Sequence, residues 1–148
     1  MVHFGNDDIG ALVAMDAKSG REIWRSGKDG TSYSSPLLAD FGDVHQIVQW
    51  NHEAIVGVEI ETGKELWRHP MPHLTHNQNM PTPSVYEGHV IVGGENRGMY
   101  SLQPVVENGN WSVKERWYQP KAALDMSSAV IVDGRLYGMT HYNAGQLF

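Results

Sequence analysis

Polar side chains gather in three segments of this 148-residue chain, and they are the first candidates for chemistry. The segments are residues 31–35, 73–80 and 124–128. Their hydroxyl and amide groups donate and accept hydrogen bonds, so they could bind a small molecule or a peptide. The same residue types also satisfy the backbone of tight turns, which is their commoner role. Six candidate ligand-binding residues follow: Ser32, Tyr33, His76, Asn77, Asn79 and Asp125.

The pair His73 and His76 raises the question of a metal ion. Two imidazoles can share an ion, but zinc sites in proteins use three or four ligands held by defined elements. This pair lies between Pro72 and Pro81, in a segment typical of a loop, and has no obvious third ligand. We therefore predict no metal site. The run of residues 6–8, Asn-Asp-Asp, lacks the spaced oxygen ligands of a calcium loop and predicts a turn.

Sequence signatures of common catalytic sites are missing. The chain has no cysteine, which excludes a disulfide or thiolate site within it. It contains neither the G-x-S-x-G pattern of a serine nucleophile nor a phosphate-binding loop. The formal net charge of −6, without a basic cluster, argues against general nucleic-acid binding. We predict no catalytic residue in this chain.

The elements that must position the polar segments are β-hairpins, because one hairpin pattern occurs twice. Residues 11–25 (ALVAMDAKSGREIWR) and 54–68 (AIVGVEIETGKELWR) each begin with the alternating apolar pattern of a strand. A turn that runs from an acidic residue to glycine follows, and each copy closes on tryptophan. The turn and closing residues are Asp16, Gly20 and Trp24 in the first copy and Glu59, Gly63 and Trp67 in the second.

Further turns extend this pattern into four-stranded units. Turns at residues 40–43, at Glu87-Gly88 and at Asp133-Gly134 separate apolar runs, and Asp-Gly is a strong hairpin signal. The spacing between units is close to that of one propeller blade, about 45 residues. The third unit has a longer hairpin at Asn108-Gly109, and its closing tryptophan slips to Trp117.

The predicted fold is therefore all-β: a partial β-propeller of four-stranded antiparallel blades, about three blades of a larger ring. Residues 1–148 form a single partial domain, with blade segments 1–25 (partial), 34–70, 82–118 and 127–148 (partial). Closed propellers have about four to eight blades. We accordingly expect the chain to be a fragment of a longer polypeptide that carries the missing blades.

The doubled hairpin resembles the tryptophan-docking repeat of PQQ-like, quinoprotein-type propellers. The first copy reads Ala14-x-Asp16-x-x-x-Gly20-x-x-x-Trp24 and matches all four marked positions. The second copy keeps Gly63 and Trp67 but has glycine at position 57 and Glu59 for the acid. The resemblance implies that each tryptophan docks on the neighbouring blade near its glycine turn. The implied docking residues are Asp16, Gly20, Trp24, Glu59, Gly63, Trp67 and Trp117.

The same resemblance carries the functional expectation. It implies that the first strand of each unit is innermost, so that the three polar segments lie at the mouth of the channel. It also implies a non-catalytic binding or protein-interaction scaffold, similar in type to the outer-membrane assembly propeller lipoprotein. A periplasmic or extracellular location and a protein or small-molecule ligand at the channel mouth follow.

Two alternatives stay open. One is a fragment of a quinoprotein alcohol or sugar dehydrogenase, dependent on pyrroloquinoline quinone (PQQ) and calcium. Many such enzymes have adjacent cysteines beside the cofactor, which this chain lacks, and neither Asp40 nor Asp125 can be matched to their catalytic acid. PQQ and calcium are therefore expected only under this alternative. The other is a sensor module fused to a signalling domain.

Overall fold

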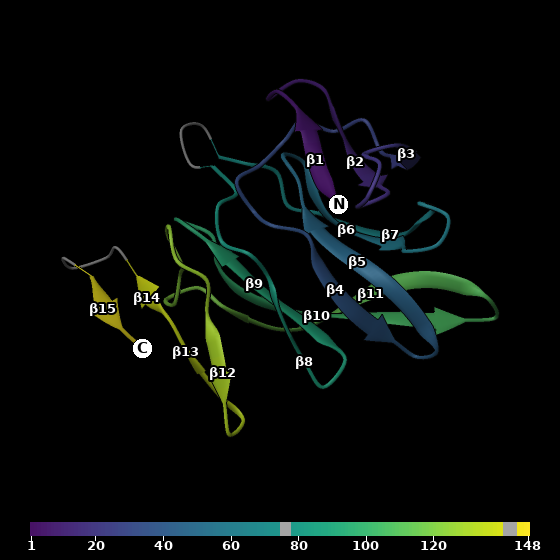
Figure 1. The fold of residues 1–148 in the computed structure, drawn as a ribbon. Helices are drawn as coiled ribbons and strands as arrows, with labels where there is room; N and C mark the ends of the chain where they lie inside the picture. The colour runs from purple at the N-terminus through teal and green to yellow at the C-terminus, as the bar shows by residue number, and fades with distance from the viewer. Residues whose placement is uncertain (75–77, 141–144) are drawn as a thin grey trace.

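The computed structural model describes residues 1–74, 78–140 and 145–148, and every regular element in these ranges is a β-strand. The sheets follow one another along the chain (Figure 1). The first sheet contains β1 (Val2–Gly5), β2 (Gly10–Met15) and β3 (Glu22–Ser26). The second contains β4 (Leu37–Phe41), β5 (Val44–Trp50), β6 (Ala54–Glu59) and β7 (Glu65–Pro70). The third contains β8 (Ser84–Tyr86), β9 (His89–Gly94), β10 (Gly98–Glu107) and β11 (Asn110–Gln119). Two short hairpins follow, β12 (Val130–Val132) with β13 (Arg135–Tyr137) and β14 (Met139–Thr140) with β15 (Gln146–Leu147).

The predicted all-β architecture is confirmed. The second and third sheets are complete four-stranded antiparallel meanders, with strand orders β4-β5-β6-β7 and β11-β10-β9-β8. The long hairpin of the third unit turns at Asn108 and Gly109, with φ of 52° and 77°. Positive φ at two successive positions is what a tight hairpin turn requires, and Asn-Gly supplies it at low cost.

The repeat is visible in the strand register as well as in the sequence. A β-bulge interrupts the ladder between residues 14 and 15 in the first sheet, 57 and 58 in the second, and 101 and 102 in the third. In each sheet the closing tryptophan pairs with the residue just before the bulge: Ala14 with Trp24, Gly57 with Trp67, and Ser101 with Trp117. The three tryptophans therefore occupy equivalent positions.

The hydrophobic core lies between adjacent sheets. Leu12 of the first sheet packs with Val56 and Val58 of the second. The largest cluster joins Trp50, Ile55 and Trp67 of the second sheet to Val90, Val92 and Leu102 of the third. Ile91 and Met99 of the third sheet pack with Leu124 and with Ile131 and Leu136 of the next hairpin. Each interface is filled from both sides, as in the packing of neighbouring propeller blades.

The antiparallel meanders place all connections between sheets at one end of the strands. We call this end the connection face; it comprises residues 27–36, 71–74, 78–83 and 120–129, together with the β5–β6 and β9–β10 turns at residues 51–53 and 95–97. The acid-to-glycine turns at residues 16–20 and 59–63 lie at the opposite end. In the described part of the chain, no helix could cross a membrane.

Candidate functional site

Two of the predicted ligand-binding residues use their polar groups to hold the connection face together. The Ser32 hydroxyl donates a hydrogen bond to the Trp50 carbonyl. Asn79 is 1% exposed, and its side-chain amide donates to the Asn51 carbonyl at 2.6 Å. The Asn79 carbonyl in turn accepts the Ser34 N–H at 3.1 Å. Ser32 and Asn79 thus form hydrogen bonds with backbone groups, which is the commoner role of serine and asparagine in turns.

The other four candidates differ in their surroundings. Tyr33 is 73% exposed. Asp125 is half-buried and lines an open hollow with Met126, Ser127, Met139 and Thr140. His76 and Asn77 lie outside the described residues. The structure therefore brings Ser32 and Asn79 to one region, around the β5–β6 turn, and places Asp125 in the last of the three connections.

A chain of equivalent hydroxyl residues links successive blades across the connection face. Ser35, Thr82 and Ser128 each stand two residues before the first strand of their sheet, β4, β8 and β12. The Ser35 N–H donates to the Thr82 hydroxyl at 3.1 Å, and the Thr82 N–H donates to the Ser128 hydroxyl at 2.9 Å. Each blade therefore fixes the next one at the same point, and the three connections lie side by side.

One large apolar side chain is exposed on each of these connections. Tyr33, Leu74 and Met126 are 73%, 41% and 76% exposed, and they lie before β4, β8 and β12 respectively. The loops that carry them are held by buried or half-buried polar groups. The connection face thus combines a hydrogen-bonded base with apolar side chains directed to solvent.

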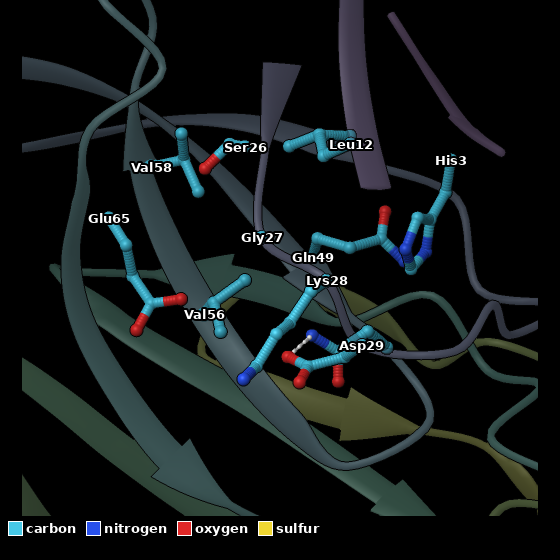
Figure 2. A pocket seen from close by; sticks show the side chains of 11 residues that line it. His3, Leu12, Ser26, Gly27, Lys28, Asp29, Gln49, Val56, Val58 and Glu65 are labelled. Carbon is cyan, nitrogen blue, oxygen red and sulfur yellow. Dashed lines mark hydrogen bonds between the residues drawn. The ribbon is translucent and has the colours of Figure 1, made fainter. Parts of the chain in front are cut away.

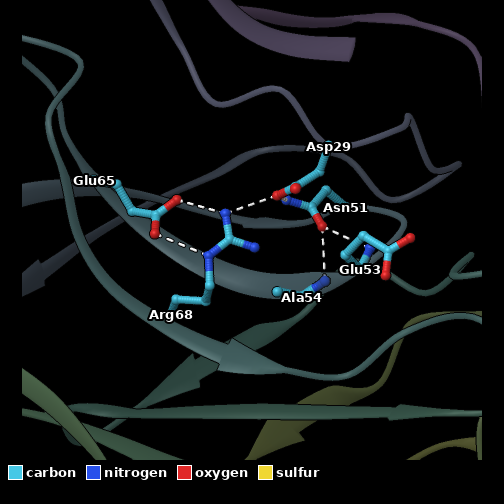
Figure 3. A network of polar contacts seen from close by, with 6 residues as sticks. All are labelled: Asp29, Asn51, Glu53, Ala54, Glu65 and Arg68. Atoms are coloured by element: carbon cyan, nitrogen blue, oxygen red, sulfur yellow. Dashed lines mark hydrogen bonds and ion pairs between the residues drawn. The ribbon is translucent and has the colours of Figure 1, made fainter. Parts of the chain in front are cut away.

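A network of charged and amide groups ties the first connection to the second sheet (Figure 3). Arg68 bridges Glu65 and Asp29, with nitrogen–oxygen distances of 2.8 and 2.7 Å. Asp29 also accepts the side-chain amide of Asn51 at 2.8 Å, and Asn51 accepts the N–H groups of Glu53 and Ala54. Hydrogen bonds from Arg68, first to Glu65 and then to Asp29, raise its pKa above the ordinary value, so the guanidinium stays charged.

The crevice beside this network is too small for an organic ligand. It lies between the first two sheets and is lined by His3, Leu12, Gln49, Val56 and Asp29, among others (Figure 2). Its volume of about 10 Å³ is that of a single water site. Burial lowers the pKa of His3, although Asp29 acts in the opposite direction. The crevice is therefore a packing feature between two blades.

Arg97 joins the second and third blades on the connection face. Its side chain is 8% exposed, donates from Nη1 to the Pro72 carbonyl at 2.7 Å and lies 4.7 Å from the centre of the Trp50 ring. Burial lowers the pKa of Arg97 to about 10, so the group is still a cation at neutral pH. A cation over an indole face is an attractive pair, and it fixes the chain just before His73.

The first closing tryptophan rests on the neighbouring blade. The Trp24 indole N–H donates to the Ile60 carbonyl of the second sheet's turn at 2.9 Å. A Cβ atom on Gly63 would lie 2.7 Å from the Trp24 ring, closer than real contacts allow, so this turn accepts the ring only because it carries glycine. Gly20, the equivalent residue of the first sheet, has a φ of 70°, and no atom of the described residues lies within 4 Å of such a Cβ. The carboxyl of Asp16 accepts the N–H of Ser19 at 2.8 Å, and that of Glu59 accepts the Thr62 hydroxyl.

The other two tryptophans differ from this arrangement. The Trp67 indole N–H donates to Gln46 of its own sheet at 2.7 Å, and its ring lies so close to Gly57 that a Cβ there would be 2.1 Å away. The glycine of the following blade's turn, Gly109, has no docked ring: no atom in the described part of the chain lies within 4 Å of its Cβ position. Trp67 is nevertheless 3% exposed, within the core between the second and third sheets. Trp117 is 41% exposed and lines an open hollow.

Comparison with known proteins identifies this repeat. The family model described as outer membrane protein assembly factor BamB matches residues 9–147, nearly the whole chain. The chain belongs to the BamB family. The resemblance to PQQ-like propeller repeats is thereby confirmed.

A solved member shows the same fold. The crystal structure of BamB from Moraxella catarrhalis matches with a TM-score of 0.60 and 18% sequence identity, over 95% of this chain and 45% of that one. The chain thus spans less than half of the length of the structure it matches. No curated protein matches the chain.

Sequence reasoning missed one cluster in this BamB-family chain. His52 and Glu53 of the β5–β6 turn meet His73, and one potential ligand atom from each lies within 4.8 Å of the others. The order of the strands could have predicted this cluster. His52 and Glu53 follow the second strand of a unit, and His73 follows the fourth. An antiparallel meander brings the ends of those two strands together. Two of the three ligands are imidazoles, which suit first-row metals rather than calcium. Asp125, the only carboxylate among the six predicted ligand-binding residues, is not part of this group.

Proposed function

We propose that this BamB-family propeller is a non-catalytic scaffold that binds a protein partner through its connection face. The observation that carries the proposal is the exposure of Tyr33, Leu74 and Met126, one on each connection between blades. A contiguous apolar patch on a protein surface marks a binding site, and hydrogen bonds between the connections bring the loops that carry these side chains side by side. Tyrosine and methionine are also enriched in protein interfaces.

The loops beneath these side chains suit such a role because they are already ordered by hydrogen bonds. Ser32, Asn79 and the Ser35–Thr82–Ser128 chain hold the backbone of the connections. A preorganised surface loses less conformational entropy on binding, which leaves more of the contact energy as affinity. The connection face is therefore a rigid base that presents a few adaptable apolar contacts.

The family supports a partner among the components that assemble outer-membrane proteins. The matching family model bears the description of an outer membrane protein assembly factor, and we extend that role and a periplasmic location to this chain. The partner surface would present an apolar patch, because Tyr33 and Met126 offer mainly apolar area.

Substitution of the exposed side chains tests the scaffold role. The double variant Tyr33→Ser with Met126→Ser should reduce recovery of outer-membrane assembly components with the intact, affinity-purified protein about tenfold or more, since interface anchors commonly contribute over 1 kcal/mol each. Its melting temperature should stay near that of the wild type, because both residues are exposed. Ile23→Ser is the matched control: Ile23 is 61% exposed on β3, outside the connection face. Equal recovery with the double variant and the wild type would overturn the proposal.

The dehydrogenase alternative makes the opposite prediction for cofactor binding. A ligand that binds the folded state raises the melting temperature by mass action. For a scaffold, PQQ and calcium added to the intact protein should leave the melting temperature unchanged and produce no dye-linked alcohol oxidation. A dose-dependent rise together with oxidation would assign the protein to the quinoprotein enzymes.

A further inference from the structure

The cluster of His52, Glu53 and His73 joins two parts of the connection face. His52 and Glu53 form the β5–β6 turn, and His73 lies just beyond the end of β7. The two Nε2 atoms are 3.2 Å apart. His52 is 5% exposed, His73 is half-buried and Glu53 is exposed, so the cluster opens to solvent on the carboxylate side.

The backbone that carries these side chains is fixed from both neighbouring connections. The His52 N–H donates to the Gly30 carbonyl at 3.0 Å, and the His52 carbonyl accepts the His73 N–H at 2.9 Å. The Met71 N–H donates to the Glu53 carbonyl at 3.0 Å. The amide of Asn79 lies 3.3 Å from the His52 carbonyl. These contacts hold the three ligand-bearing residues together without any ion.

The spacing of the imidazoles matches that of two ligands on one ion. Zinc–nitrogen bonds of about 2.0–2.1 Å in a tetrahedral site place two nitrogens about 3.3 Å apart. The two rings lie with centroids 3.6 Å apart and planes at 58°, so they must turn before both lone pairs meet at one point. Metal on both Nε2 atoms would place each ring's remaining proton on Nδ1. Both Nδ1 atoms are buried and have no hydrogen-bond partner among the described residues, so no hydrogen bond at Nδ1 fixes the orientation of either ring.

We propose that His52, His73 and Glu53 form a site for a divalent first-row metal ion, with Zn²⁺ the best fit. Two imidazoles and one carboxylate leave a fourth tetrahedral position open, as in zinc sites that exchange a ligand. The Glu53 carboxylate supplies the negative charge that two neutral imidazoles lack. Ca²⁺ and Mg²⁺ are poor occupants because both take oxygen ligands. A bound ion would cross-link the β5–β6 turn to the connection that follows β7.

Metal titration of the intact protein tests the site. Zn²⁺ added to chelator-treated protein, followed by calorimetry, should show one tight equivalent per chain and a rise in melting temperature. Co²⁺ in place of Zn²⁺ should give the visible absorption of a tetrahedral site with nitrogen and oxygen ligands. A large excess of Ca²⁺ should not displace either ion.

Substitution locates the ion and separates binding from folding. His73→Gln should weaken Zn²⁺ binding by about 100-fold or more and Glu53→Gln by at least tenfold, since even groups outside the ligand shell contribute 10–100-fold. His45→Gln is the matched control: His45 is exposed on the β4–β5 hairpin side of the second sheet. His73 and Glu53 are not fully buried, so both variants should fold, and the metal-free melting temperatures verify this. Absence of a tight equivalent, or equal affinity in His73→Gln and His45→Gln, would overturn the proposal.

Discussion

The two copies of the repeated hairpin fold alike and use their closing tryptophans differently. In both, a backbone hydrogen bond closes the turn, from Gly20 to Asp16 in the first copy and from Gly63 to Glu59 in the second. Trp24 nevertheless lies on the next sheet, against Gly63, whereas Trp67 lies across its own sheet over Gly57. Near-identical local sequences thus give the same hairpin but two kinds of joint between blades.

The residue paired with Trp67 permits the position of its ring. Trp24 pairs with Ala14 and Trp67 with Gly57, next to the same bulge. A methyl group at position 57 would stand 2.1 Å from the Trp67 ring, so the ring can lie there only over glycine. Glycine at position 57 is therefore required for the Trp67 ring to cover its own sheet.

The largest effect should come from removing the two rings in turn. Trp67→Ala should lower the free energy of unfolding by about 3–5 kcal/mol, because it leaves a cavity in the core between two sheets and deprives Gln46 of its donor. Trp24→Ala should lower it by about 2 kcal/mol, since that ring is half-buried. Urea unfolding of both variants measures the contrast. Equal losses would mean that the two joints are energetically alike.

Restoring the methyl group tests the steric explanation. Gly57→Ala should cost about 3 kcal/mol, because the new Cβ displaces the Trp67 ring from a packed core. The displaced indole should also become more accessible to a fluorescence quencher, measured in the Trp24→Phe background to reduce other signals. A Gly57→Ala protein with unchanged stability and quenching would show that position 57 does not set the joint.

The two turn glycines provide an internal control for the docked ring. Both have positive φ, 70° at Gly20 and 76° at Gly63, so alanine is strained at either position by about 1–2 kcal/mol. Only Gly63 carries the Trp24 ring, which a Cβ would meet at 2.7 Å. Gly63→Ala should therefore destabilise the protein by about 1–2 kcal/mol more than Gly20→Ala. Chemical unfolding of the two variants side by side decides this, and equal costs would argue against a docked ring.

The smallest effect concerns the acid that begins the first turn. A hydrogen bond from the Ser19 hydroxyl, and then one from the Ser19 N–H, lower the pKa of Asp16. A carboxyl with a lowered pKa in the folded state contributes stability above its unfolded pKa, and the contribution disappears as the pH falls through the folded pKa. Asp16→Ala should accordingly melt slightly below the wild type at neutral pH, and the gap should close under acid conditions below about pH 4. A difference in melting temperature that grows as the pH falls would contradict the predicted direction.

Much of the fold could be predicted because the hairpin signal is local. Strand alternation, the turn glycines and Asn108-Gly109 determine each hairpin through neighbouring residues alone. The position of the Trp67 ring could not be predicted. It depends on the hydrogen bond to Gln46 and on the lack of a Cβ atom at position 57, and the strand register brings both residues to the ring. The glycine at position 57 was visible as a departure from the repeat, but its meaning required the paired strand.

The candidate site was only partly predictable for the same reason. The three polar connections follow from the order of strands, and Asn79 and Ser32 could be singled out by residue type. Their hydrogen-bond partners are the carbonyl groups of Trp50, at the end of β5, and Asn51, which no side-chain pattern reveals. His52 and His73 are 21 residues apart in sequence and meet only because two strand ends meet.

Site-specific photo-cross-linking tests directly whether the connection face binds a protein partner. A photoreactive side chain would be placed at Tyr33, at Met126 or, as the control, at Ile23 in the intact protein within cells. Positions 33 and 126 should form an adduct with the same outer-membrane assembly component, identified by mass spectrometry, and position 23 should not. An adduct with that component from position 23 alone, or none from positions 33 and 126, would contradict binding through the connection face.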